Sequence, residues 1–252
     1  MLGLLRRVVG VARRVLAVLR PRARGARGAT PRRRTGLASL AAGAGVGVFG
    51  GLGWLVGSEA TGALDVAIST GLQQAENALL ATSMQAISAL GAPPLGLPLL
   101  IGVPALLWRF GHRLAGPFAL LGAVGATLGA AALKQLWRRP RPTDEVVTIF
   151  GDAPAGTSFP SGHTLLYVTF FGFLLYWSWT FLRPGRLRTV LVTTCGLLIG
   201  LIGVSRIYLG HHWASDVLAS YALGFAGLLV LIQLYARSRR ALTPAALPVP
   251  GP

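Results

Sequence analysis

Six stretches of the chain are apolar and almost free of charge, and they constrain the fold more than any other feature. They cover residues 37–56, 93–108, 116–133, 164–182, 189–204 and 217–236. A bilayer core of about 30 Å needs about 20 apolar residues of helix. The second and fifth stretches are shorter than this, so the pattern does not define their boundaries. We therefore predict an all-α integral membrane protein with six transmembrane helices.

The composition agrees with this class. Only 12% of the residues are charged and 53% are hydrophobic, with a mean hydropathy of +0.61. Soluble domains carry about 25% charged residues, which cover their surface. A soluble two-domain protein is therefore disfavoured. The lone cysteine, Cys195, lies in an apolar stretch and is interpreted as a small packing residue.

The segment 64–90, between the first two predicted spans, has a different pattern. Apolar residues recur there at helical spacing from Ile68 to Leu90, and polar residues at 73, 74, 76 and 77 fall between them. A helix with one apolar and one polar face suits a membrane surface. The pattern therefore predicts one amphipathic helix lying at the interface.

The first 35 residues form a basic arm, with eleven arginines before residue 35 among leucines and valines. The spacing predicts an amphipathic helix on an anionic lipid surface. A basic tail that only sets topology fits the pattern equally well, and an arginine-rich, acid-free segment is also typical of an organelle transit peptide. No aromatic residues interleave the arginines, so nucleic-acid binding is not predicted. The predicted organisation is an arm over 1–35, a membrane domain over 36–236 and a tail over 237–252.

The arginines also predict the orientation, because short cytoplasmic loops of membrane proteins are enriched in Lys and Arg. With the arm in the cytoplasm, alternate loops are basic: those of Arg109 and Arg113, of Arg183, Arg186 and Arg188, and of Arg237, Arg239 and Arg240. Both termini are thus predicted to be cytoplasmic in the plasma membrane. One outer loop, 134–163, breaks the rule because it carries Lys134, Arg138, Arg139 and Arg141. This exception indicates a function.

Three outer segments, 134–142, 160–163 and 205–216, are predicted to meet on one face. They supply Lys134, Arg206 and arginines of the 134–142 segment, among which these arguments do not select. Several fixed cations converging in this way favour a multiply charged anion, and arginine matches phosphate oxygens well. The "PSGHT" segment begins a helix, whose N-terminus with Ser161 and Gly162 also favours an anion.

His212 and Asp216 lie four residues apart, so a helix places them on one face within hydrogen-bond reach. The carboxylate would orient the imidazole, and His212 itself would attack phosphorus. His163 would protonate the leaving oxygen and later activate water. A single arginine or histidine at a helix end is often only an interfacial anchor. Together, however, such costly groups indicate a site.

No metal or cofactor is predicted, because apart from Asp216 no carboxylate is placed to join the histidines. His211 lies one residue off the face that His212 shares with Asp216. It is therefore interpreted as a neighbour of the site.

Three motifs resemble those of the type-2 phosphatidic acid phosphatase superfamily, the lipid phosphate phosphatases. Lys-x6-Arg-Pro covers residues 134–142, Pro-Ser-Gly-His covers 160–163 and Ser-Arg-x5-His-x3-Asp covers 205–216. The resemblance extends over about residues 60–236 and does not reach the arm. The soluble haloperoxidases that hold vanadate share this signature, but the six apolar stretches argue against them.

The resemblance implies a role for each motif residue and selects Arg141 among the neighbouring arginines. His212 is implied as the nucleophile, Asp216 as its partner and His163 as the acid, with Lys134, Arg141, Ser161, Gly162 and Arg206 binding phosphate. The implied activity is metal-independent hydrolysis of a lipid phosphate or diphosphate through a phosphohistidine. Candidate substrates are polyprenyl diphosphates, as for undecaprenyl diphosphatase, phosphatidic acid and phosphatidylglycerophosphate.

Two alternatives stay open at this stage. A lipid phosphotransferase would use the same phosphohistidine and would reveal itself by an acceptor-dependent product. A non-catalytic lipid transporter would show no turnover. The expected partners are the lipid phosphate substrate and membrane lipids, and the sequence does not define an oligomeric state.

Overall fold

The computed structural model describes residues 32–242 except 76 and 153, so the predicted arm and most of the tail lie outside it. All regular structure in this described part is helical. The helices are α2 (Arg32–Gly57), α3 (Gly62–Gln73), α4 (Ala78–Ala89), α5 (Gly96–Arg109), α6 (Ala115–Trp137), α7 (Gly162–Phe181), α8 (Arg186–Tyr208) and α9 (Ala214–Ala241).

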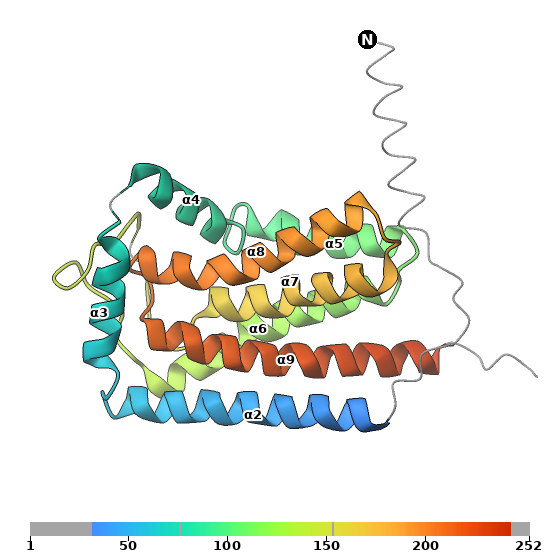
Figure 1. Cartoon of the computed structure of the whole chain (residues 1–252), viewed down its shortest axis with the longest axis horizontal. Helices are drawn as coiled ribbons and strands as arrows, with labels where there is room; N and C mark the ends of the chain where they lie inside the picture. The colour runs from blue at the N-terminus through green and yellow to red at the C-terminus, as the bar shows by residue number, and fades with distance from the viewer. Residues whose placement is uncertain (1–31, 76, 153, 243–252) are drawn as a thin grey trace, which may run out of the picture.

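Five helices of the described part are long and apolar enough to cross a membrane: α2, α6, α7, α8 and α9. They run side by side in Figure 1, as expected of a multi-pass membrane protein. The second predicted span, residues 93–108, corresponds to α5, which has 14 residues and contains Pro104. At 1.5 Å per residue it is about 21 Å long, which is less than a bilayer core. The six-span count therefore stays a prediction.

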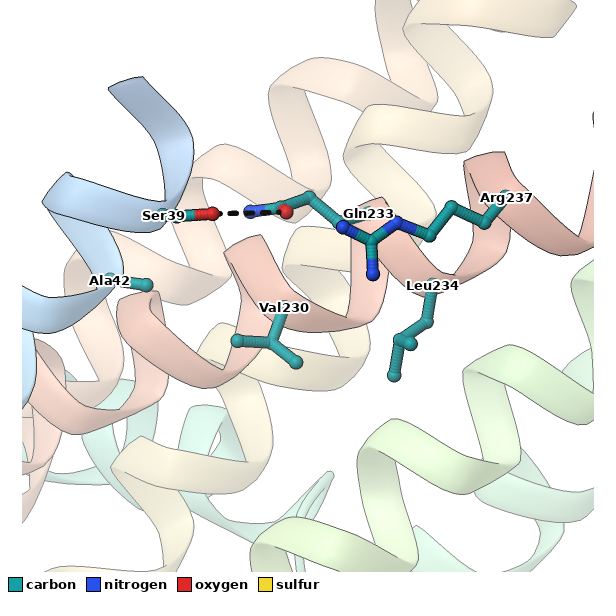
Figure 2. A pocket seen from close by; sticks show the side chains of 6 residues that line it. All are labelled: Ser39, Ala42, Val230, Gln233, Leu234 and Arg237. Atoms are coloured by element: carbon teal, nitrogen blue, oxygen red, sulfur yellow. Dashed lines mark hydrogen bonds between the residues drawn. The ribbon is translucent and has the colours of Figure 1, made fainter. Parts of the chain in front are cut away.

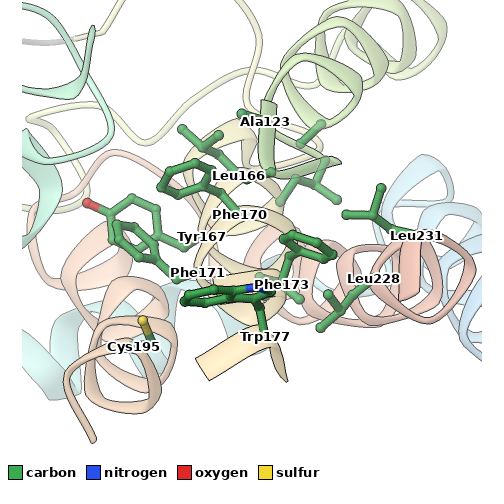
Figure 3. Close-up of a cluster of buried hydrophobic side chains, with 14 of the residues drawn as sticks. Ala123, Leu166, Tyr167, Phe170, Phe171, Phe173, Trp177, Cys195, Leu228 and Leu231 are labelled. Atoms are coloured by element: carbon green, nitrogen blue, oxygen red, sulfur yellow. The ribbon is translucent and has the colours of Figure 1, made fainter. Parts of the chain in front are cut away.

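Helix α7 is at the centre of the bundle. It packs against α6, α8 and α9, and Tyr167, Phe170 and Phe173 are fully buried. Figure 3 shows these rings on different sides of α7, with Leu228 and Leu231 of α9 on the side of Phe173. A helix that is apolar all round must be covered on all sides. The buried run from Leu165 to Phe173 therefore explains why α7 is the innermost helix.

Small residues let neighbouring helices approach closely, as in many membrane proteins. A Cβ atom at Gly45 of α2 would lie 2.8 Å from the carbonyl oxygen of Ala222 in α9. A Cβ atom at Gly116 of α6 would overlap the carbonyl oxygen of Pro104 in α5. Both contacts are to backbone, which cannot move aside as a flexible side chain can.

We expect Gly116→Ala to destabilise the protein by about 1–3 kcal/mol, because the added methyl group forces α5 away from α6. The matched control is Gly125→Ala on the same helix, where a Cβ atom meets nothing within 4 Å. That change removes a helical glycine and is expected to be neutral or slightly stabilising. Thermal unfolding in detergent, followed by tryptophan fluorescence, measures both. Equal midpoints for the two variants would contradict the packing argument.

The single amphipathic helix predicted over 64–90 is two helices, α3 and α4. They are separated at residues 74–77, where Asn77 caps α4 by accepting from the backbone N–H of Leu79 at 2.8 Å. Helix α3 crosses the end of the bundle (Figure 1) and buries polar residues, Asp65, Ser69 and Gln73. Its polar side therefore faces the protein. A location at the membrane interface stays a prediction.

Candidate active site

The three predicted segments meet at one end of the bundle. The end of α6, the start of α7, the end of α8 and the start of α9 all lie there, beside α3 (Figure 1). The loop 138–161 crosses this end and contacts α9 and the turn between α8 and α9 through side-chain hydrogen bonds. Each predicted site residue lies in or beside this cluster.

The two ring nitrogens of His212 face opposite surroundings. Nδ1 lies 3.5 Å from Oδ2 of Asp216, and Nε2 lies 3.3 Å from Nη1 of Arg141. A guanidinium can only donate, so this contact favours an unprotonated Nε2 with the proton on Nδ1. The ring is 2% exposed and Asp216 is 0% exposed. The arrangement leaves a lone pair directed at the cations.

Asp216 is held from several sides. Its Oδ2 accepts from the Ser158 hydroxyl and, at 3.0 Å, from the backbone N–H of Trp213. The second contact closes the first turn of α9, where a carboxylate also interacts favourably with the helix dipole. Its Oδ1 pairs with Arg139 at 2.6 Å. The carboxylate therefore has a fixed orientation relative to His212.

Lys134 and Arg141 lie on the loop side of the site. Lys134 Nζ donates to the carbonyl oxygens of Thr157 and Ser158, and Arg141 Nη1 donates to that of His211 at 2.6 Å. Among the described residues, neither cation has a carboxylate partner within ion-pair distance. Their positive charges are therefore available to an anion.

Arg206 is the most deeply buried cation, at 4% exposed. Its Nη1 donates to the hydroxyl of Ser88 on α4, whereas its Nε has no hydrogen-bond partner. Within the described residues, it takes part in no ion pair. A buried charge without a counter-ion is costly. An anion bound beside Arg206 would relieve this cost.

His163 opens α7 next to these cations. Its Nε2 is buried without a hydrogen-bond partner, and the side chain lies within electrostatic range of Arg206, His212 and Arg141. The turn between α4 and α5 covers it, because a Cβ atom at Gly91 would lie 2.8 Å from His163 Cδ2. An unpartnered imidazole nitrogen here is free to exchange a proton with a ligand.

Ser161 is the N-cap of α7 and is fully buried. Its Oγ accepts from the Thr164 hydroxyl at 3.0 Å, and its own hydroxyl hydrogen stays available. Its backbone N–H donates to Ser220 on α9 at 2.7 Å. Gly162 follows as the first helical residue, and the first N–H groups of a helix have no intrahelical partner. The start of α7 thus offers donors to an anion.

Burial controls the protonation of the two neighbouring histidines. The pKa of His212 is lowered to about 3, mainly because the ring is buried; Arg206 and Arg141 act in the same direction, and Asp216 opposes them. The pKa of His211 is lowered to about 4, again mainly by burial. Its Nε2 lies 3.1 Å from the carbonyl oxygen of Phe150. Burial thus favours the neutral form of His212 at physiological pH.

Several polar contacts of this end were missed by sequence reasoning. Arg139 joins Asp65 to Asp216, Ser158 contacts Asp216, Ser215 contacts Asp65, and Ser88 contacts Arg206. Arg139 lies in the motif at 134–142, but the sequence does not distinguish it from the neighbouring arginines, which carry the same charge. Asp65 and Ser88 come from the segment interpreted as an interfacial helix. No spacing rule connects them to the motifs.

No cluster of three or more His, Cys, Asp or Glu residues in the described chain is arranged to hold a metal ion. The structure has other hollows, and one of about 260 Å³ lies between α2 and α9 (Figure 2). It is lined by Ser39, Ala42, Val230, Gln233, Leu234 and Arg237, towards the end of these helices that is far from His212. Its lining shares no residue with the cluster described above.

The geometry can now be set beside known proteins. Residues 116–240 match the model of the PAP2 superfamily. This region belongs to the PAP2 superfamily. It contains all three motifs and His212, Asp216 and Arg206. The family resemblance predicted from the motifs is thereby confirmed.

Individual proteins and solved structures that resemble this chain agree with the family match. The chain is 28% identical over 142 residues to phosphatidylglycerophosphatase B of Bacillus subtilis strain 168. The matched region covers 56% of this chain and 68% of that protein. The crystal structure of a transmembrane PAP2-type phosphatidylglycerolphosphate phosphatase from Bacillus subtilis has a TM-score of 0.63 and 26% identity, covering 80% of this chain and 98% of that one. Aquifex aeolicus LpxE shares the fold, with a TM-score of 0.54 at 23% identity over 68% of this chain and 95% of its own.

Proposed function

We propose that this chain, a lipid phosphatase of the PAP2 type, hydrolyses its lipid phosphate through a phosphohistidine on His212. The observation that carries the proposal is the opposed surroundings of the imidazole ring. Nδ1 faces Asp216, and Nε2 faces Arg141 among cations that lack carboxylate partners. A neutral ring held in this way presents a nucleophilic lone pair where a phosphate would bind.

In the first step, the lone pair of His212 Nε2 attacks phosphorus and the P–O bond to the lipid breaks. The bonding pair leaves with the lipid oxygen, which takes a proton from Nε2 of protonated His163. The negative charge of the bound phosphate favours this protonated form. In the second step, water attacks phosphorus, gives its proton to His163 and breaks the P–N bond. Inorganic phosphate leaves and both histidines return to their starting states. Asp216 accepts from Nδ1–H of His212 and stabilises the charge that forms on the ring.

Phosphate binding would use Lys134, Arg141 and Arg206 together with the start of α7. Arg206 contributes most, because it is buried and has a free Nε. Donors placed where negative charge accumulates on the phosphoryl oxygens stabilise the transition state. Ser161 and Gly162 add the hydroxyl and backbone donors of a helix N-terminus.

For the substrate, we favour phosphatidylglycerophosphate as the first candidate. Both Bacillus subtilis relatives are named for this phosphatase activity. Phosphatidic acid and polyprenyl diphosphates present the same terminal phosphate and are the other members of the test panel. The lipid chain would be selected outside the phosphate cluster.

The proposed site faces the extracytoplasmic side. The basic loops after α5 and α7 and the end of α9 lie at the opposite end of the bundle from the start of α9, which His212 directly precedes in the chain (Figure 1). Cytoplasmic ends of membrane proteins are enriched in arginine. This arrangement supports a site at the outer face. In it, α2 begins on the cytoplasmic side and α9 ends there. Labelling of single cysteines placed in loop 138–161 by a membrane-impermeant maleimide on whole cells tests it.

The decisive experiment measures phosphate release by the purified full chain in detergent micelles, with EDTA present, from each lipid of the panel. The fastest lipid identifies the substrate class. Labelled substrate should leave acid-labile, base-stable phosphate on the quenched protein, as expected of phosphohistidine. Loss of the lipid phosphate without release of inorganic phosphate, dependent on an added alcohol, would instead indicate a phosphotransferase. Folded protein that turns over no lipid would contradict the proposal.

Ser88→Ala is expected to weaken binding of orthovanadate, a phosphate mimic, by about tenfold. The reason is that Ser88 holds the Arg206 guanidinium, and a hydrogen bond to a charged group contributes about 1.5–3 kcal/mol. The matched control is Ser83→Ala on the same helix, where the exposed hydroxyl bonds only to its own helix, at Leu79. Inhibition of phosphate release by vanadate measures both variants. Equal inhibition constants would show that Ser88 does not position Arg206.

A further inference from the structure

A row of three charged side chains runs behind the candidate nucleophile. Arg139 Nη1 lies 2.6 Å from Oδ1 of Asp216, and Arg139 Nη2 lies 2.6 Å from Oδ2 of Asp65. Asp65 is 2% exposed. One guanidinium thus bridges two buried carboxylates, with one nitrogen for each. Such charge-assisted pairs are strong and directional.

Asp65 makes more contacts than the ion pair alone. Its Oδ1 accepts from the backbone N–H of Ser215 at 2.8 Å, and its Oδ2 accepts from the Ser215 hydroxyl at 2.7 Å. Ser215 also accepts from Arg139 Nη1 at 2.7 Å. Asp65 therefore ties α3 to the first turn of α9, which carries Asp216. This carboxylate lies outside the region that matches the PAP2 superfamily, residues 116–240.

The row affects His212 through charge as well as through position. The negative charge of Asp216 favours the protonated imidazole of His212. The positive charge of Arg139, on the other side of the carboxylate, weakens this effect. The negative charge of Asp65 in turn partly neutralises the positive charge of Arg139. The two carboxylates and the guanidinium together carry one net negative charge. The other ionisable groups around His212 are Arg141 of the loop, Arg206 of α8, His163 of α7, Lys134 of α6 and the adjacent His211. All of these are shared by the variants considered below.

We propose that Arg139 and Asp65 are positioning residues of the reaction: Arg139 orients Asp216 and keeps His212 unprotonated, and Asp65 holds Arg139 in place. The inference rests on the proposed role of His212 as nucleophile. Neither residue reaches the phosphate, because both nitrogens of the Arg139 fork are engaged by carboxylates. They act through Asp216.

Arg139→Gln is expected to lower kcat by about 10²-fold with little change in KM, because a carboxylate that is misplaced by about 1 Å costs this much. It is also expected to move the acidic limb of the kcat/KM profile to higher pH by about one pH unit, since Asp216 without the guanidinium favours protonated His212. Profiles between about pH 2 and 8 with dioctanoyl phosphatidic acid measure both effects, because this range includes the wild-type limb set by the His212 pKa of about 3. The ionisation of this substrate is the same for every variant.

Charge and geometry are separated by two further variants. Arg139→Lys keeps the charge but loses the fork, so kcat should fall while the acidic limb stays at its wild-type position. Arg138→Gln is the matched control, since the exposed Arg138 donates only to the carbonyl oxygen of Gln135 and should behave as wild type. A purely structural role for Arg139 predicts lower stability and less active enzyme, with no movement of the limb in any variant.

Asp65→Asn tests the outer end of the row. It should lower kcat by about tenfold, because Arg139 loses one of its two anchors. In the double variant Asp65→Asn with Arg139→Gln, one unbalanced carboxylate has been removed, so the acidic limb should return towards wild type. The proposal would be overturned if the fold losses in kcat of the two single variants simply multiply in the double variant and its acidic limb stays at the position found for Arg139→Gln.

The two proposals fail in different ways. If His212→Ala retains activity, the nucleophile assignment is wrong, and Arg139 and Asp65 have no nucleophile to position. If His212→Ala is inactive but the Arg139→Gln limb coincides with that of wild type, the assignment of His212 stands and the positioning proposal is wrong. Thermal unfolding midpoints of each variant in detergent show that folded proteins are being compared.

Discussion

His212→Ala is expected to reduce phosphate release by at least about 10⁴-fold, which is the scale of losing a nucleophile. The ring is the only described group that joins Asp216 on one side to Arg141 on the other, so no neighbour can replace it. The phosphate trapped on the quenched protein should disappear with it. Steady-state release and trapping in the same preparation measure both.

His211→Asn is the matched control for that variant. The adjacent ring is directed at the carbonyl oxygen of Phe150, so its loss is expected to change activity by less than about threefold. If instead His211→Asn abolishes release and His212→Ala does not, the spacing argument has selected the wrong histidine. Activity in both variants would mean that neither histidine is the nucleophile.

Asp216→Asn is expected to lower kcat by about 10³-fold or more with KM nearly unchanged. An amide keeps the acceptor for Ser158 and for the Trp213 N–H, so the first turn of α9 should persist. It loses the charge that stabilises the imidazolium and the preference for Nδ1–H, and an equivalent change in a serine protease triad costs about 10⁴-fold. Steady-state kinetics in micelles give kcat and KM separately.

The stability of Asp216→Asn decides how its kinetics are interpreted. Arg139 keeps Asp65 as a partner in this variant, but its Nη1 faces the new amide NH2 group in place of Oδ1, so a lower unfolding midpoint with a folded protein is expected. The exposed Asp152→Asn is a control for the loss of one negative charge and should be silent. A folded Asp216→Asn enzyme with wild-type kcat would remove Asp216 from the reaction.

Much of this site was predictable because its residues follow local rules. The four-residue spacing of His212 and Asp216 is a property of any helix, and alternation of spans and loops puts the three motifs on one face. The motif also selected Arg141 over its neighbours, and the structure places Arg141, not Arg138, against Nε2 of His212. Arg138 is exposed and ends α6 with a positive φ of 45°.

The pattern of α3 and α4 shows why other parts could not be predicted. Polar residues between apolar ones suggest an outward polar face, as on any amphipathic helix. In the structure the opposite holds for Asp65 and Gln73, because loop 138–161 and the start of α9 supply partners for them. A polar residue is buried when it finds such partners. Those partners lie 74 or more positions away in the chain.

The amino-acid sequence by itself determined the class of protein, the apolar stretches and the motif residues that gather at one end, since hydropathy and helical spacing act over short distances. Only the tertiary structure decided which helix is central, that α3 turns its polar side inward, and which groups hold the motif side chains. The links of Arg139 to Asp65 and of Arg206 to Ser88 are contacts between distant segments. They exist because buried charges must find partners, and those partners are defined only once the helices have packed.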